Sequence, residues 1–480
     1  MPTPISRPRR RWLTGLGALI AGFSWPVWAL GKPVARKTVV RRRPLAKTAV
    51  PAEAPAGLLK VAAMTYTRRT LPNGLELIAQ AGGSGGSVAV QVWYRVGGKD
   101  DPPGRSGFAH LFEHLMFKST KNMPSEQFDR LTEDVGGSNN AFTAEDVTAY
   151  HEVVPSHHLE RLLWAEAERM ANLNVDEANF KSERSVVEEE FRQRVLANPY
   201  GRLFEAIAPN AWDVHPYHRP VIGSIEDLNA ATLDDVRAFH ATFYRPDNAI
   251  LIVTGDYDPD QMNAWVDRYF GPVARPAKQV PRVHVSEPRW TRNKEVLLTG
   301  PNVPLPAVLL IWQGPAADSA DAPVLQVIQA LLAGGESSRL NQALVYRQRL
   351  AQSAGFEAML HTDGGAVMAF AIAAGQRKTS TLVAPLIAEL ARLANAPIPA
   401  AELDKVKTQI LTAALNGRQS AEGRAMSFGW AMINHGDPEA VNRELEALQA
   451  VSAADVQRVL KKTVISQPFV TLHYTQEPKP

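Results

Sequence analysis

The feature that most constrains this chain is the pentapeptide His110-Leu111-Phe112-Glu113-His114, which lies inside the apolar run from Phe108 to Phe117. Residues four apart share one face of a helix, so His110 and His114 are expected to present two imidazoles one turn apart. Glu113 falls on the adjacent strip of the same surface. Two neutral imidazoles at this spacing suit a tetrahedral Zn²⁺, and a neighbouring carboxylate can take a proton from a water that the metal activates. The H-x-x-E-H order is the inverted form of a catalytic zinc-binding motif.

A catalytic zinc centre has three protein ligands, so one more is needed beside the two histidines. Two histidines on one helix also occur in purely structural helices, and a third ligand would distinguish the two cases. The chain has 480 residues and no cysteine, so the ligand must be His, Asp or Glu, and disulfides and thiolate nucleophiles are excluded. The acidic helical stretch 176–196 offers four candidates by residue type, which are Glu183, Glu188, Glu189 and Glu190. Glu183 and Glu190 share a helix face, so one can bind metal while the other hydrogen-bonds a ligand. The spacing does not choose between them.

The first 29 residues have the pattern of a signal peptide. A basic segment, residues 7–11, precedes the uncharged apolar stretch from Trp12 to Leu30, and Val27-Trp28-Ala29 fits cleavage after Ala29. The run Arg9-Arg10-Arg11-Trp12-Leu13 resembles a twin-arginine signal, so Sec and Tat export both stay open. We expect a periplasmic protein with no membrane span in its mature chain, the alternative being an uncleaved signal that anchors it.

Residues 30–63 form a basic linker, rich in Pro and Ala, that cannot supply a packed core. Residues 1–52 contain 11 Lys and Arg and no acid, whereas the whole chain has a net charge of +3, so residues 53–480 carry −8. The basic character therefore belongs to the N-terminal tail, and the remaining body is acidic. This balance argues against a nucleic-acid partner.

The rest of the chain reads as two similar α+β domains, each a largely antiparallel sheet packed with helices. The first domain, residues 64–272, contains the strand Val88–Val96 ahead of the motif helix, and a proline-rich linker, 273–290, leads to the second domain, 291–476. There the strand Ala307–Trp312 is again followed by a helix, but the second domain has no H-x-x-E-H. We expect one catalytic and one architectural domain. Further expected elements are one long strand over 138–154 and helices over 381–395, 400–416 and 436–461.

Several motifs together make the chain resemble the pitrilysin-type inverzincin metallopeptidases, and among these the mitochondrial-processing-peptidase-like branch. The resemblance covers nearly all of residues 65–475 and rests on Gly107–Lys118, Asn140–Thr143, Glu183–Glu190, Tyr244–Asn248 with Gly255-Asp256, and Gly335–Leu340. In this family the third ligand lies seven residues after the Glu of a Glu-Arg pair, which corresponds to Glu190 here. Glu183 then corresponds to the supporting acidic residue, and Glu189 is the next candidate ligand if the register slips by one.

The resemblance implies a zinc-dependent endopeptidase with one Zn²⁺ per chain, held by His110, His114 and Glu190, and with Glu113 as the general base. A peptide substrate is expected to add as a strand beside Asn140, Ala141, Phe142 and Thr143. The implied family fold is a clam shell, in which two pairs of domains enclose a chamber that admits unfolded peptides. This chain supplies one pair of domains and therefore half of the chamber.

One departure from the family pattern points to a partner subunit. Active members place an Arg and a Tyr, seven residues apart, in the domain without the motif, where they hold the substrate carbonyl. The corresponding positions here are Val345 and Gln352, with Tyr346 and Arg347 as stand-ins if the register is shifted. We therefore expect a heterodimer with a related subunit that lacks the zinc motif and carries the Arg/Tyr pair.

Two other functions compete with that of a peptidase. A scaffold subunit of the same fold would need no catalysis, but the intact set of His110, Glu113, His114 and Glu190 argues against it. Metal storage or sensing would be expected to show further histidine clusters. The other close histidine pairs, His157-His158 and His215/His218, read as surface or structural residues.

Overall fold

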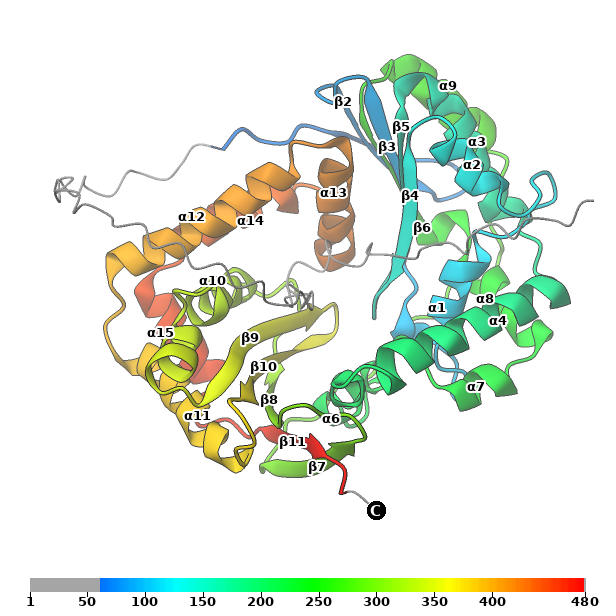
Figure 1. Cartoon of the computed structure of the whole chain (residues 1–480). Helices are drawn as coiled ribbons and strands as arrows, with labels where there is room; N and C mark the ends of the chain where they lie inside the picture. The colour runs from blue at the N-terminus through cyan, green and yellow to red at the C-terminus, as the bar shows by residue number, and fades with distance from the viewer. Residues whose placement is uncertain (1–60, 479–480) are drawn as a thin grey trace, which may run out of the picture. The chain divides into compact units, whose positions relative to one another are not determined.

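The computed structural model describes residues 61–478. The predicted signal peptide, residues 1–29, and all but the last three residues of the predicted linker, 30–63, lie outside the described residues. Residues from Met64 onward form one compact unit with two β-sheets, each packed with helices (Figure 1). The predicted mixed α/β class is confirmed.

The first sheet has six strands in the order β1-β2-β6-β3-β5-β4. Neighbouring strands are antiparallel except β2 and β6, which run parallel. The central strands β3 and β6 are almost wholly buried, because apolar residues fill both of their faces. The elements of this half are β1 Thr67–Thr70, β2 Glu76–Ala81, β3 Ser87–Tyr94, α1 Phe108–Leu115, α2 Gln127–Glu133, β4 Ser138–Thr143, β5 Thr148–Pro155, α3 Leu159–Asn172, α4 Glu177–Phe191, α5 Gly201–Glu205, α6 Ala208–Ala211, α7 Ile225–Ala230, α8 Leu233–Phe243, β6 Ala249–Gly255 and α9 Pro259–Tyr269.

The second sheet has five strands in the order β7-β11-β8-β10-β9. Again one pair, β7 and β11, is parallel and the other pairs are antiparallel. The elements of this half are β7 Lys294–Gly300, β8 Ala307–Gly314, α10 Ala322–Ala333, β9 Ala351–His361, β10 Gly364–Ala373, α11 Ser380–Asn395, α12 Ala400–Gly417, α13 Ala421–His435, α14 Ala440–Ala450, α15 Ala453–Thr463 and β11 Val470–Gln476.

The two sheets repeat one strand plan. Without β1, the order β2-β6-β3-β5-β4 corresponds position by position to β7-β11-β8-β10-β9, and the parallel pair occupies the same place in both. The first α-helix after the central strand is α1 in one repeat and α10 in the other. The predicted internal repeat is thus confirmed in the topology of the sheets.

The two halves meet where α13 packs against strands β3, β5 and β6 of the first sheet (Figure 1). Gly429 of α13 permits a close approach, because a Cβ there would lie 2.1 Å from the Trp93 ring. Trp93 is fully buried, contacts Trp430 edge to face at 5.3 Å between ring centroids, and donates its indole N–H to Gln91. Two aromatic rings are therefore part of the junction between the halves.

The predicted long strand over 138–154 is wrong, because the chain turns back within it. β4 and β5 pair with each other as an antiparallel hairpin, with Ser138 opposite Val153. The turn is closed by the Ala144 N–H, which donates to the Val147 carbonyl at 2.8 Å. The alternation of side chains runs through both strands, so periodicity alone hid the turn.

In the second half one expected helix is wrong in its extent, and two elements were not predicted. The helix expected over 436–461 is two helices, α14 and α15, because Ser452 caps a new helix through a reciprocal pair of hydrogen bonds with Asp455. The preceding helix α13, which ends at the left-handed Gly436, and the strand β9 were not predicted. The expected helices over 381–395 and 400–416 match α11 and α12.

Within residues 61–478, no single helix combines the length and apolar composition that a membrane span requires. The pair α11 and α12, bent by 105° at the short break between them, passes this test only when taken together. Four leucines of α11 are fully buried inside the protein, namely Leu382, Leu386, Leu390 and Leu393.

Candidate metal centre

Helix α1, which carries the motif, is held at its N-terminus by Asp101. The Asp101 carboxylate accepts the N–H of Gly107 at 2.7 Å and of Ala109 at 2.8 Å, and so satisfies donors that the first turn leaves free. Burial raises the pKa of Asp101 to about 7, although these two amides act in the opposite direction. Gly107 has a φ of 90°, and a Cβ there would lie 2.8 Å from the Ile222 carbonyl oxygen, so this position requires glycine.

Helix α4 packs against α1 and supplies the acidic side of the site. The side chain of Asp176 begins the helix by accepting the N–H of Asn179 at 2.8 Å. Glu183 and Glu190, two turns apart, both face α1, as their spacing predicts. The exposed Glu189 side chain instead accepts a hydrogen bond from Gln193 on the outer surface.

The side chains of His110, His114 and Glu190 converge on one point. Nε2 of His110 and Nε2 of His114 each lie 3.4 Å from the same oxygen, Oε2 of Glu190. These three residues are also the single His, Asp and Glu group with metal-ligand spacing among residues 61–478, with ligand atoms within 4.8 Å of one another.

The geometry of this group fits a zinc ion. Separations of 3.4 Å are long for hydrogen bonds, and Nε2 of His110 is buried with no hydrogen-bond partner. A tetrahedral zinc centre with metal–ligand distances of about 2.0–2.2 Å sets its ligand atoms about 3.3–3.6 Å apart. The two imidazoles and one carboxylate therefore match Zn²⁺ in donor type, and both separations between an imidazole nitrogen and the carboxylate oxygen match its ligand spacing.

Glu113 lies beside this group with one oxygen engaged. Its Oε2 is 3.3 Å from Nδ1 of His110 and accepts the hydroxyl of Thr143 at 2.7 Å. Burial raises the pKa of Glu113, but the hydrogen bond and charge of His110 outweigh burial and leave this pKa below its ordinary value. Glu113 is therefore an ionised carboxylate that can accept a proton. The contact from Thr143, which was predicted only as a substrate-binding residue, was not foreseen.

Glu183 supports the other histidine from the far side. Its Oε2 lies 3.5 Å from Nδ1 of His114, while its Oε1 accepts from Lys118 at 2.5 Å and from Ser182 at 3.1 Å. A carboxylate on the second ring nitrogen fixes the orientation of an imidazole and raises its basicity. Lys118, which follows the end of α1, was not predicted.

A second residue that was not predicted, Arg194, forms an ion pair with the Glu190 oxygen that does not face the histidines. Nη1 of Arg194 lies 2.6 Å from Glu190 Oε1, so Oε2 alone faces the two histidines. Arg194 belongs to the π-helical segment Arg192–Leu196, which continues α4. Widened helical turns of this kind are frequent at functional sites. The signal in the sequence was the four-residue spacing from Glu190, which one face of a helix brings together.

The surrounding carboxylates make this a site for positive charge. Burial lowers the pKa of His110, but the nearby carboxylates of Glu113 and Glu190 outweigh burial and raise it to about 10. The pKa of His114 is raised as well, since Glu183 and Glu190 outweigh its burial. Burial raises the pKa of Glu190, and the two histidines reverse this and hold it well below its ordinary value. The cluster therefore favours either protonated imidazoles or a bound cation.

Strand β4 lies next to the metal centre at the edge of its sheet. The residues predicted to bind substrate alternate along it: the Thr143 hydroxyl reaches Glu113, whereas the Phe142 ring stacks on Trp430 at 5.6 Å between centroids. The N–H of Ala141 donates to the side-chain oxygen of Asn140 at 2.9 Å. Among the described strands β5 alone pairs with β4, so the outer edge of β4 can accept another strand.

Val345 and Gln352, the two positions at which the resemblance implied an Arg and a Tyr, belong to the second half of the chain. Val345 is half-buried in the π-helical segment Asn341–Arg347, and Gln352 is exposed near the start of β9. The neighbouring Tyr346 is 48% exposed. No described contact joins these side chains to the histidines of α1.

Two family descriptions match successive parts of the chain. Residues 78–224 match "Insulinase (Peptidase family M16)" and residues 230–410 match "Peptidase M16 inactive domain". The candidate metal centre lies in the first part, and strands β7 to β10 of the sheet without the motif lie in the second, whereas β11 follows it in the chain.

Similar proteins agree with this assignment. The chain is 34% identical over 340 residues to the zinc protease PqqE of Helicobacter pylori, a match that covers 70% of this chain and 77% of that protein. A crystal structure of a protease from Helicobacter pylori superimposes with a TM-score of 0.83 at 30% identity, covering 86% of this chain and 100% of that one. A probable mitochondrial-processing peptidase subunit beta of Arabidopsis thaliana is 22% identical, over 82% of this chain and 75% of that protein. The chain belongs to peptidase family M16, as its motifs predicted, and several of its relatives are named zinc proteases.

Proposed function

We propose that this protein is a zinc-dependent endopeptidase that cleaves unfolded peptides. The observation that carries the proposal is the convergence of Nε2 of His110 and Nε2 of His114 on one oxygen of Glu190, at 3.4 Å each. A Zn²⁺ ion bound there would lower the pKa of a water molecule to about 7 and polarise the scissile carbonyl.

The protein groups around the metal centre have distinct tasks in this reaction. Glu113 takes the proton of the attacking water on its carboxylate and later delivers it to the leaving amine. The hydroxyl of Thr143, 2.7 Å from Oε2, holds that carboxylate in one orientation. Glu183 fixes the ring of His114 through Nδ1, and Arg194 fixes Glu190 through Oε1.

The peptide substrate binds as an added strand at the outer edge of β4. An edge strand offers backbone N–H and C=O groups whatever the side chains of the peptide, which suits a broad substrate class. The expected contacts come from Asn140, Ala141, Phe142 and Thr143. Because the N–H of Ala141 is covered by the Asn140 side chain, an incoming peptide would displace that side chain as it pairs.

The active assembly includes a second, related subunit that lacks the zinc motif. This part of the proposal rests on Val345 and Gln352, which stand where active members of the family carry an Arg and a Tyr for the substrate carbonyl. The Val345 side chain has no hydrogen-bond donor, and Gln352 offers a neutral amide in place of the charged guanidinium or the phenol. The partner would supply that pair and the other half of an enclosing chamber.

Two measurements on the purified protein test the proposal. Elemental analysis should find one zinc per chain, and Glu113→Gln should retain the metal while losing cleavage of an unfolded peptide. His110→Ala should lose both. A wild-type protein that binds no zinc under these conditions would instead support the scaffold alternative. Full activity of the isolated chain would refute the need for a partner but leave the peptidase assignment intact.

Export to the periplasm is proposed on the residues before Met64, which contain the basic segment and the apolar stretch that ends at Leu30. Cell fractionation followed by N-terminal sequencing of the mature protein tests it. A new N-terminus after Ala29 in the periplasmic fraction is expected. A full-length chain in the membrane fraction would identify an uncleaved anchor, and full-length chain in the cytoplasm would refute export.

A further inference from the structure

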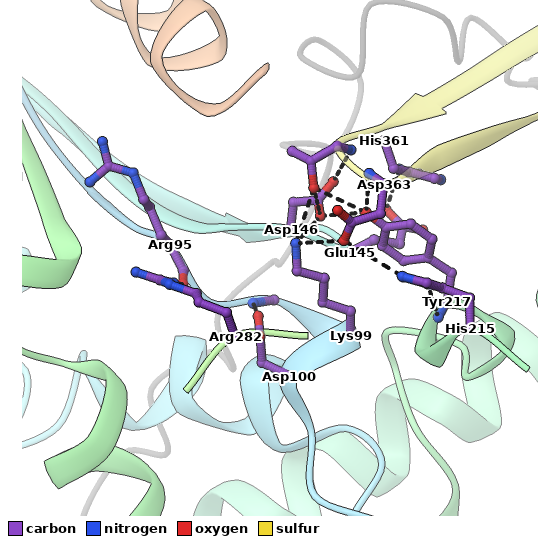
Figure 2. A network of polar contacts seen from close by, with 12 residues as sticks. Arg95, Lys99, Asp100, Glu145, Asp146, His215, Tyr217, Arg282, His361 and Asp363 are labelled. Atoms are coloured by element: carbon purple, nitrogen blue, oxygen red, sulfur yellow. Dashed lines mark hydrogen bonds and ion pairs between the residues drawn. The ribbon is translucent and has the colours of Figure 1, made fainter. Parts of the chain in front are cut away.

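A buried polar cluster outside the metal centre joins the two halves of the protein (Figure 2). Its middle is Asp146, in the turn between β4 and β5, which is 8% exposed. The carboxylate accepts hydrogen bonds from Lys99 at 2.5 Å and Tyr217 at 2.6 Å, and from the N–H and hydroxyl of Thr362 at 2.9 and 2.7 Å. Thr362 lies at the tip of the β9–β10 hairpin in the second half. We name these residues the clasp: Lys99, Asp146, Tyr217 and Thr362.

The clasp is specific in its charge and geometry. Nζ of Lys99 lies 3.1 Å from the Thr362 hydroxyl and 3.5 Å from Asp363 Oδ2, so a cation of the first half meets polar groups of the second. Both oxygens of Asp146 are engaged, which is how a buried carboxylate avoids the cost of an unpaired charge. A buried hydrogen-bond network whose members are satisfied holds one arrangement of its partners better than apolar contact alone.

One route leads from the clasp to Glu113 through strand β4. Asp146 lies three residues after Thr143, whose hydroxyl holds the Glu113 carboxylate. The turn between them is fixed on its other side, because the N–H of Gly98 donates to the Ala144 carbonyl at 3.0 Å. A shift of the turn therefore moves the hydroxyl that orients the general base.

A second route leads to helix α1. Lys99 is two residues before Asp101, whose carboxylate accepts the N–H groups of Gly107 and Ala109 at the start of the motif helix. The N–H of Lys99 also donates to the Glu145 carbonyl at 3.1 Å, so the segment before α1 and the turn after β4 move together. Both elements that carry the catalytic groups are thus tied to one buried point.

We propose that Thr362 is a positioning residue, through which the half without the motif sets the relative placement of β4 and α1 and so of Thr143 and Glu113. This inference rests on the proposed peptidase function. It gives the second half a role inside the active site, in addition to forming a wall of the chamber. Thr362 touches neither substrate nor metal in this account and acts only through Asp146 and Lys99.

A second threonine hydrogen bond between the halves serves as a matched control, because it does not reach the catalytic elements. The hydroxyl of Thr254, in β6, is buried and donates to the Ala421 carbonyl at the start of α13 at 2.6 Å. This bond also crosses between the halves, but it does not involve α1, β4 or the turn after β4. Replacing either threonine by valine removes one hydroxyl between the halves with little change in side-chain volume.

The test compares Thr362→Val, Thr362→Ser and Thr254→Val in the full chain, assayed with its partner subunit if activity requires one. Thr362→Val should lower kcat about 10- to 100-fold, because small misplacements of catalytic groups have effects of this size. KM and zinc content should change less than about 2-fold, and Thr362→Ser should restore kcat. Thr254→Val should keep the wild-type kcat, even if it lowers the melting temperature as much as Thr362→Val does. Equal kcat values for the two valine variants would overturn the inference.

Hydrogen exchange separates this inference from the peptidase proposal. Thr362→Val should speed amide exchange in residues 108–115 and 138–143, whereas Thr254→Val should leave these two segments unchanged. This comparison needs no catalytic activity, so it decides the role of the clasp even if the wild-type protein cleaves nothing. Unchanged exchange in both segments for Thr362→Val would refute the positioning role.

Discussion

The two halves of this protein share one strand plan, yet the helix that follows the central strand differs completely between them. In the first half α1 presents His110, Glu113 and His114 to a facing helix, and glutamates from that helix complete a polar site. In the second half α10 is apolar apart from Gln326 and Gln329, and it packs among α12, α14, α15 and β9. The difference indicates that the candidate metal centre depends on the side chains of α1 and on the packing of α4 against it, because the two sheets share one strand plan apart from β1.

The largest effect is expected from the removal of Glu190, the proposed zinc ligand, which has no counterpart in the second half. Glu190→Ala should lower zinc affinity by more than about 100-fold, beyond the 10- to 100-fold effect of a group that only supports a ligand. Glu189→Ala, one residue earlier on the exposed surface, should bind zinc as the wild type does. Zinc titration with a competing chelator measures both. The reverse result would move the ligand to the register that ends at Glu189.

A matched pair of leucines sharpens the contrast between α1 and α10. Leu111 and Leu332 are both fully buried, so Leu111→Ala and Leu332→Ala should each lower the free energy of unfolding by about 2–5 kcal/mol. Only Leu111→Ala should also weaken zinc binding, because it disturbs the helix that carries the histidines. Urea denaturation of the metal-free protein gives the first quantity and zinc titration the second. Weakened zinc binding in Leu332→Ala would contradict the purely structural role of α10.

The point where the halves join gives a pH-dependent prediction. Burial raises the pKa of Asp146, but Lys99 outweighs burial and lowers it from 3.8 to about 2. A carboxyl whose pKa is lower in the folded state stabilises the protein above pH 3.8, and this stability is lost as the pH falls from 3.8 towards 2. Asp146→Asn should therefore cost about 2 kcal/mol near pH 7 and progressively less below pH 4. Thermal unfolding at a series of pH values tests it, and a difference that stays constant down to pH 2 would refute it.

The smallest effect is expected at the residue that supports His114. Glu183→Gln keeps the shape of the side chain and removes the charge that faces Nδ1 of His114 and Nζ of Lys118. Zinc affinity should fall about 10-fold, at the lower end of effects at such positions. The matched change Glu188→Gln, at a residue that pairs with Arg192 instead, should leave it unchanged. Loss of all zinc binding in Glu183→Gln would make Glu183 a direct ligand.

Much of the fold and part of the site followed from local pattern. The i, i+4 spacing predicted that His110 and His114 share a face, and the seven-residue spacing did the same for Glu183 and Glu190. Local pattern could not choose Glu190 among four glutamates, because a helix says which residues share a face and not what lies opposite. That choice came from the resemblance to a family.

The features that were missed depend on contacts between distant parts of the chain. Asp146 meets Tyr217 and Thr362, which are 71 and 216 residues away, and no local pattern links such positions. The hairpin of β4 and β5 was read as one strand for a related reason. Its turn residues carry no glycine or proline, and the alternation continues across them.

We propose that one zinc ion lies between the histidines of α1 and Glu190 of α4. Anomalous diffraction at the zinc absorption edge, on crystals of the purified protein without added metal, tests this most directly. We predict one strong peak, about 2.0–2.2 Å from Nε2 of His110, Nε2 of His114 and Oε2 of Glu190. A peak elsewhere, or crystals with no zinc signal in protein purified without chelators, would contradict the account.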